Sequence, residues 1–295
     1  MAGTESVRIP QAIAGLFTFS TAGILAGGLR EFQKKENAWV AGMVLLCLPW
    51  FIYNGSRQFA DIPQSACILA SLVSLSLFFQ NEGNSNRWLI LSGLLAGISA
   101  WVKNEGQLFL LVYFAILGVA AFSIFRKKRG RTFFTHLMIG LLLPLVVLGI
   151  FKTTLAPAND VINSETMNQS LSMLFSMDRY REILSKYHLF HRTFGGLSFP
   201  FPIFFIISIF LMKPRISAEN KVAFFFTVTV LVLQWIGYFV IYVITPHNLA
   251  NHINTSYERL LLHLYPSILM AAFMLTTPLS DFLKTSEIGQ DTPAV

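Results

Sequence analysis

The sequence predicts an all-α, polytopic membrane protein, a transmembrane helical bundle with about nine spans. Of its 295 residues, 54% are hydrophobic and only 13% are charged, whereas soluble domains carry about 25% charged residues. The apolar residues form continuous runs of about 15–25 residues, long enough to cross the hydrocarbon core as helices. These runs lack the alternation of apolar and polar residues that membrane barrel strands show. Lipid offers no partner to backbone polar groups, so helices are expected.

Nine apolar runs account for the expected spans, and charged or turn-forming residues separate them along the chain. We expect one transmembrane domain, residues 1–295, with a long outer loop, residues 152–196, inserted after the sixth span. The expected spans are 9–28, 38–53, 62–80, 88–102, 107–125, 132–151, 197–212, 221–245 and 259–277.

The distribution of basic residues predicts the orientation of the chain. More than half of the 22 basic residues fall in alternate connections on one side, where the run 126–129 is the densest group. Loops rich in Lys and Arg remain in the cytoplasm. We therefore expect an N-terminus outside, a cytoplasmic C-terminus and an integral protein of a bacterial inner membrane. The net charge of +7 follows from this topology, so we expect the lipid bilayer as a partner and no nucleic acid.

The second half of the outer loop 152–196 has the pattern of an amphipathic helix. Apolar residues such as Leu174, Ile183 and Tyr187 alternate there with charged residues such as Arg179 and Lys186. This spacing suits a helix that lies in the membrane interface. It also suits an ordinary surface helix packed on the bundle, and the sequence leaves both open.

Asp61 stands at the expected outer mouth of the third span, shortly before Pro63. A carboxylate held there could act as a general base or bind a metal ion. The helix dipole alone also favours a carboxylate at a helix N-terminus. Position alone therefore leaves a functional and a purely structural interpretation open.

Lys103 and Glu105 lie in a tight outer turn, WVKNEGQ, between the fourth and fifth spans. Opposite charges between apolar helices are costly unless they are paired or used. The lysine could bind a lipid phosphate as a point charge, or it could be a snorkelling lysine in an exposed turn. Because the flanking spans are short, we favour a functional role.

Arg259 begins the ninth span, where a cation opposes the helix dipole and so needs an anionic partner. A phosphate or carboxylate of a site would serve, although an interfacial anchor is the common alternative. One lipid phosphate could serve both Arg259 and Lys103. We therefore expect these two side chains to lie close together at the outer face.

Three segments resemble the C-type membrane glycosyltransferases, the superfamily that includes the protein O-mannosyltransferases and the lipid A aminoarabinose transferases. They are FADIPQSACILASL, LSGLLAGISAWVKNEGQLFLL and YERLLLHLYPSILM. They resemble, in order, the outer Asp and Pro before a span, the glycine-rich span that ends in a Lys-x-x-Gly turn, and the Arg-Leu-Leu start of a late span. The resemblance covers roughly residues 40–275.

The resemblance implies an enzyme that transfers a sugar from a polyprenyl-phosphate donor to an acceptor on the outer face. Asp61 would be a catalytic carboxylate that assists the base or a divalent metal, and Glu105 would orient Lys103 or touch the acceptor. Lys103 and Arg259 would bind the lipid phosphate. The sequence shows no metal-ligand set, and whether a metal takes part is left open.

The chain departs from that family at its N-terminus. Family members begin with a span and a long outer loop that supplies the main catalytic carboxylate, whereas Glu5 is the only acidic residue before the first span here. We therefore expect a truncated, weakly active form, in which a partner chain or the missing N-terminal segment would have to supply the catalytic carboxylate. Two other classes stay open, a transporter or flippase for a lipid-linked or anionic substrate and a non-catalytic membrane partner subunit.

The charge asymmetry generates a topology prediction. In intact cells, an impermeant thiol reagent should label a Glu165→Cys variant and should not label a Lys128→Cys variant, both made after Cys47 and Cys67 are replaced by Ser. Detergent-opened cells, in which both positions should react, serve as the control. Labelling of position 128 alone in intact cells would invert the orientation.

Overall fold

The computed structural model describes residues 7–57, 59–81, 85–124, 127–157, 170, 172–193, 206–207, 210 and 214–277. Within these ranges the chain is helical with short connections and contains no strand. Its helices are α1 (Arg8–Phe32), α2 (Lys35–Leu46), α3 (Pro49–Ser56), α4 (Asp61–Gln80), α5 (Asn86–Val102), α6 (Asn104–Ile124), α7 (Lys127–Thr154), α9 (Met177–Thr193), α11 (Lys221–Ile244) and α12 (Leu249–Leu275). The predicted all-α class is confirmed for the described residues.

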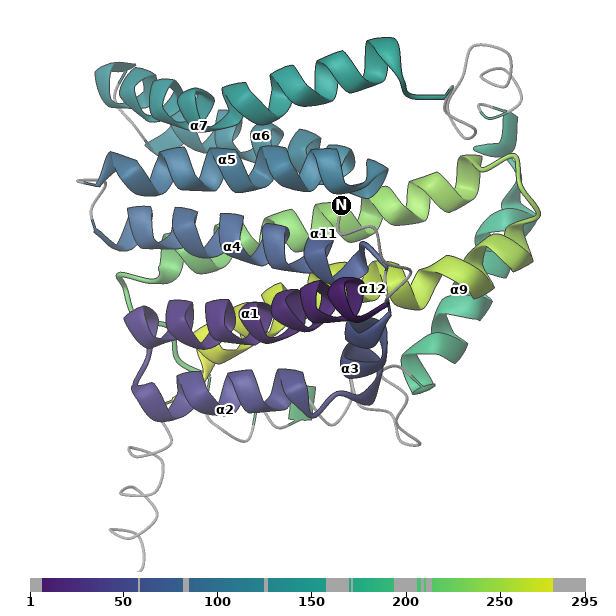
Figure 1. Ribbon diagram of the computed structural model, residues 1–295, viewed down its shortest axis with the longest axis horizontal. Helices are drawn as coiled ribbons and strands as arrows, with labels where there is room; N and C mark the ends of the chain where they lie inside the picture. The colour runs from purple at the N-terminus through teal and green to yellow at the C-terminus, as the bar shows by residue number, and fades with distance from the viewer. Residues whose placement is uncertain are drawn as a thin grey trace, which may run out of the picture.

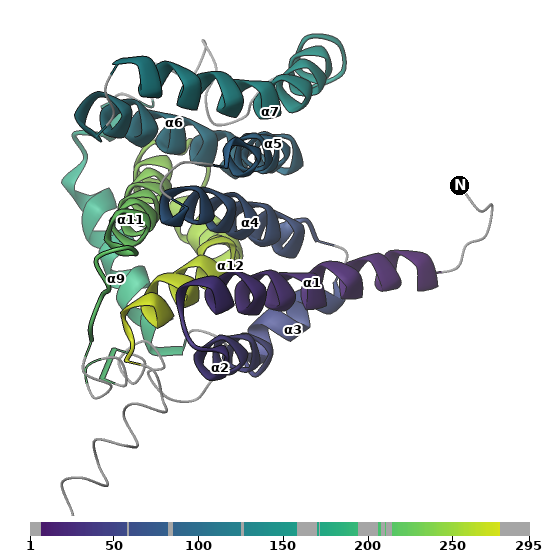
Figure 2. The ribbon, with the colours of Figure 1, turned by 90° about the vertical axis from the view of Figure 1, so that its left-hand side faces the viewer.

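The helices lie side by side in a bundle around α4 and α12 (Figures 1 and 2). Helices α2, α1, α4, α5 and α7 follow one another across the bundle, with α6, α11 and α12 against them. In α4 and α12 about four fifths of the most apolar stretch is buried inside the protein, at 83% and 78%, against 28% in α7. The outer helices turn large apolar side chains outward, among them Phe19, Leu143 and Phe225. An apolar outer surface of this kind suits contact with lipid.

Five helices are long and apolar enough to cross a membrane, or six if the bent pair α2 and α3 counts as one span. The five are α1, α4, residues Gly130–Thr154 of α7, α11 and α12. Helix α5 has 17 residues, and the apolar part of α6, Asn104–Val119, is also shorter. The expected span 197–212 lies outside the described residues, apart from residues 206, 207 and 210. Nine spans therefore stay a prediction.

The expected span 38–53 is broken in the structure into two helices, α2 and α3. Helix α2 ends at Leu46, α3 begins at Pro49, and the two helices meet at an angle of 65°. Proline disfavours helical backbone at the residue before it, and Leu48 is accordingly extended with ψ 111°. Pro49 itself occupies the first turn of α3, where its missing N–H costs nothing. The break turns α3 away from the direction of α2.

One buried and one partly buried contact hold α9 against α11 and α12. Tyr187 of α9 stacks on Tyr257 of α12, with ring centroids 3.9 Å apart. Arg179 donates to the backbone carbonyls of Tyr242 and Thr245, at 3.1 and 2.8 Å, and so caps the C-terminal end of α11. A helix is therefore present in the expected loop, and one face of it packs on the bundle. Its position in a membrane interface stays a prediction.

The Arg179 cap generates a prediction about α9. An Arg179→Met variant loses two hydrogen bonds from a cation, an interaction of about 1.5–3 kcal/mol each. Amide hydrogen exchange over residues 177–187 should therefore accelerate about tenfold or more. The matched control is Arg181→Met, because Arg181 is 83% exposed and pairs only weakly with Asp178 at 3.9 Å. Equal exchange in both variants would show that the cap does not hold α9.

Candidate functional site

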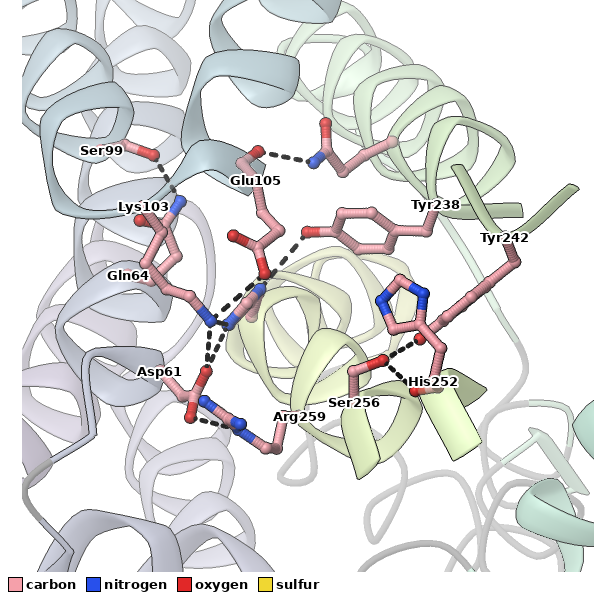
Figure 3. Close-up of polar contacts among 12 residues, drawn as sticks. Asp61, Gln64, Ser99, Lys103, Glu105, Tyr238, Tyr242, His252, Ser256 and Arg259 are labelled. Carbon is pink, nitrogen blue, oxygen red and sulfur yellow. Dashed lines mark hydrogen bonds and ion pairs between the residues drawn. The ribbon is translucent and has the colours of Figure 1, made fainter. Parts of the chain in front are cut away.

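Charged residues from three separate segments meet where α4 begins and α5 ends (Figure 3). The start of α4 supplies Asp61, the turn between α5 and α6 supplies Lys103 and Glu105, and the first half of α12 supplies Arg259. The structure thus brings all four candidate residues from the sequence into one cluster. The expected proximity of Lys103 and Arg259 is present, although the anion between them is a carboxylate of the protein.

The carboxylate of Asp61 is the centre of this cluster. Its side chain is fully buried. Oδ1 accepts from Lys103 Nζ at 2.8 Å and lies 2.9 Å from His263 Nε2, while Oδ2 accepts from Arg259 Nε at 2.8 Å. A buried carboxylate is costly unless several donors satisfy it, and here three side chains do so. Asp61 also begins α4, where the helix dipole favours a negative charge.

The α5–α6 turn is one residue long, and this tightness positions Lys103. Lys103 is extended, with φ −152° and ψ 159°, between the last residue of α5 and the first of α6. The chain then returns at once against α5, so that a Cβ at Gly106 would clash with the backbone carbonyl of Ser99. Gln64 of α4 donates to the hydroxyl of Ser99 at 2.7 Å, which ties the turn to the helix that carries Asp61.

Three of the four charged side chains reach the surface of the protein. Lys103 is 18% exposed, Glu105 26% and Arg259 35%. Lys103 also pairs with Glu105 at 3.3 Å. The guanidinium carbon of Arg259 lies 4.7 Å from the ring centre of Phe59, an arrangement that favours the cation. In the part of the chain that the structure describes, the two terminal amino groups of Arg259 have no protein partner, so they are available to a ligand.

Sequence reasoning missed His263 and Tyr238. His263 is fully buried, lies one helical turn after Arg259, and points the other edge of its ring at the Tyr238 hydroxyl of α11, with Nδ1 at 3.4 Å. The spacing of Arg259 and His263, four residues apart at the start of the apolar part of α12, was the available signal, because residues i and i+4 share one helix face.

The donors around Asp61 do not suit a metal ion. Both of its oxygens already contact nitrogen atoms, two of them cationic, and a divalent cation among these groups would be repelled. Within the described ranges, no three His, Cys, Asp or Glu side chains are grouped to hold a metal. We therefore assign no metal role to Asp61.

A comparison with protein families adds the decisive observation. Residues 1–150 match the family described as dolichyl-phosphate-mannose-protein mannosyltransferase. The chain belongs to this family. No curated protein and no solved structure matches the chain. The predicted membership of the membrane glycosyltransferase superfamily is confirmed.

The mannosyltransferase-family match divides the cluster in two. It includes Asp61, Lys103 and Glu105, on α4 and the α5–α6 turn, whereas Arg259 and His263 on α12 lie beyond residue 150. The tertiary contacts of Asp61 therefore join the matched half to the other half of the chain. The apolar helices of the chain and the family match together indicate an integral membrane protein.

The tight turn generates a prediction that uses two glycines of α6. Gly106→Ala should force the α5–α6 turn apart, because its Cβ would meet the backbone of Ser99, whereas a Cβ at Gly118 meets nothing within 4 Å. Overpacking of this kind costs about 1–3 kcal/mol. Thermal unfolding in detergent should thus be lowered by Gly106→Ala and left unchanged or raised by Gly118→Ala. Equal effects of the two substitutions would contradict the close packing.

Proposed function

We propose that the protein transfers a sugar from a polyprenyl-phosphate donor to an acceptor on the outer face of the membrane. The family match supports a membrane glycosyltransferase, and family members named for dolichyl-phosphate-mannose use a lipid-linked donor. The observation that carries the proposal is the pair Lys103 and Arg259, two partly exposed cations that converge on one anion at the end of the bundle where α4 begins and α5 ends. An end of the bundle is where the phosphate of a lipid would lie.

Arg259 and Lys103 are proposed to bind the phosphate of the donor. The Nε of Arg259 is used by Asp61, which leaves the two terminal amino groups in the fork geometry that binds a phosphate through two oxygens. Lys103 adds a point charge with three donors. When the bond between the sugar carbon and the phosphate oxygen breaks, negative charge develops on that phosphate. Two fixed cations stabilise this charge and so accelerate its departure.

The two carboxylates are proposed to have different roles. Asp61 is buried and contacts three nitrogen donors, so it suits the orientation of Lys103 and Arg259 better than it suits proton abstraction. Glu105 is 26% exposed and is the carboxylate that an acceptor hydroxyl could reach, as a general base. A partner chain could supply the further carboxylate expected from the superfamily resemblance.

The placement of charge favours this proposal over a transporter. The ion-paired residues Asp61, Lys103, Glu105 and Arg259 gather at the end of the bundle where α4 begins and α5 ends, whereas transporters often bind substrate near the midplane between repeats. Chemistry at the membrane surface needs charge at one end only. Phosphate binding, rather than passage through the bundle, is therefore the first property to measure.

Binding of a polyprenyl monophosphate to the purified chain tests the proposal. Lys103→Met and Arg259→Met should each weaken binding by about tenfold or more, because each removes a charge-assisted contact. Arg181→Met is the control, since Arg181 lies on α9 and is 83% exposed. Inorganic phosphate in a parallel titration separates a lipid site from a general phosphate site. Unchanged lipid binding in both site variants would refute the proposal.

A further inference from the structure

The three donors to Asp61 differ in what else they can do. Lys103 and Arg259 reach the surface, at 18% and 35% exposure, and can contact a ligand. His263 is fully buried and cannot. Among these three donors, His263 is therefore the one that a ligand cannot reach, and its ring contacts only groups of the protein: Asp61, Tyr238 and, at 3.5 Å, Lys103 Nζ.

The contacts of His263 fix its orientation and its tautomer. Its Nδ1 lies 3.4 Å from the hydroxyl of Tyr238, and its Nε2 lies 2.9 Å from Asp61 Oδ1. A carboxylate can only accept, so Nε2 carries the hydrogen, and a neutral ring then accepts from the Tyr238 hydroxyl at Nδ1. Tyr238 is 1% exposed, so water does not replace this contact. Asp61 Oδ1 thus accepts one hydrogen bond, from His263, that a ligand cannot reach, and Tyr238 holds the His263 ring in place.

This buried hydrogen bond has a consequence for any phosphate at the site. Lys103, Arg259, Asp61 and Glu105 carry two positive and two negative charges, so an incoming phosphate competes with Asp61 for both cations. A buried carboxylate that loses its partners pays a large desolvation cost. A strong hydrogen bond from His263 to Asp61 lowers this cost. Lys103 and Arg259 can then move their donor groups from Asp61 to the phosphate more easily.

We infer that His263 is a positioning residue for the donor phosphate, which it favours by holding Asp61 while Lys103 and Arg259 engage the ligand. Tyr238 supports it by fixing the imidazole. The inference rests on the proposed phosphate role of the two cations. It adds a residue that acts through Asp61 and does not touch the substrate.

The inference predicts opposite effects at two residues in direct contact. His263→Phe keeps a ring of similar size but removes the donor, so Asp61 draws more strongly on Lys103 and Arg259, and binding of polyprenyl monophosphate should weaken about tenfold. Asp61→Asn removes the competing charge, so binding should tighten by several-fold. Misfolding would weaken binding in both variants, so the opposite signs distinguish positioning from a general structural defect.

Two conservative variants complete the experiment, which measures equilibrium binding to the full-length chain in detergent. His263→Gln retains an Nε2–H donor and should restore at least half of the lost binding free energy. Tyr238→Phe keeps the ring but frees Nδ1, and should weaken binding about two- to threefold. Wild-type binding in His263→Phe, or weaker binding in Asp61→Asn, would overturn the inference, while Lys103→Met and Arg259→Met still report on the phosphate role. If those two variants bind normally, the proposed function fails and this inference fails with it.

Discussion

The carboxylate of Asp61 has no contact with solvent, so the folded chain must bring hydrogen-bond donors to it. An unpaired charge inside an apolar bundle would cost several kcal/mol. The donors come from the α5–α6 turn and from α12, which are 42 and 198 to 202 residues away along the chain. The need of Asp61 for hydrogen-bond donors therefore brings the start of α4, the α5–α6 turn and α12 together. It also places Lys103 and Arg259 at the surface of the protein.

Close backbone packing makes that meeting possible. Gly106 lets α6 return directly against the end of α5, and Gln64 links α4 to the same turn. Deeper in the bundle, the Ser92 hydroxyl contacts that of Tyr113 at 2.6 Å and donates to the Ser71 carbonyl at 2.7 Å. Small residues and interhelical hydrogen bonds of this kind hold helices together where lipid cannot drive association. The site thus lies among helices that are closely packed and joined by hydrogen bonds.

The cluster balances its own charge, and this balance links the geometry to the proposed chemistry. Two cations face two carboxylates, one buried and one partly exposed. In a site of this composition the charges pair with one another, and the terminal amino groups of Arg259 are left to contact an anion. Preorganised cations act most effectively on charge that develops during a reaction, as the proposed release of a lipid phosphate requires.

The sequence by itself determined the helical membrane class and four residues of the site. Long apolar runs can only form helices in lipid, and Asp61, Lys103, Glu105 and Arg259 stood out because isolated charges beside such runs need partners. Only the tertiary structure decided that Lys103 and Arg259 share Asp61 as their partner and that His263 and Tyr238 complete the network, because these residues come from segments far apart in the sequence. It also decided the break before Pro49, because a proline can either start a helix or bend one, and the surrounding packing selects the outcome.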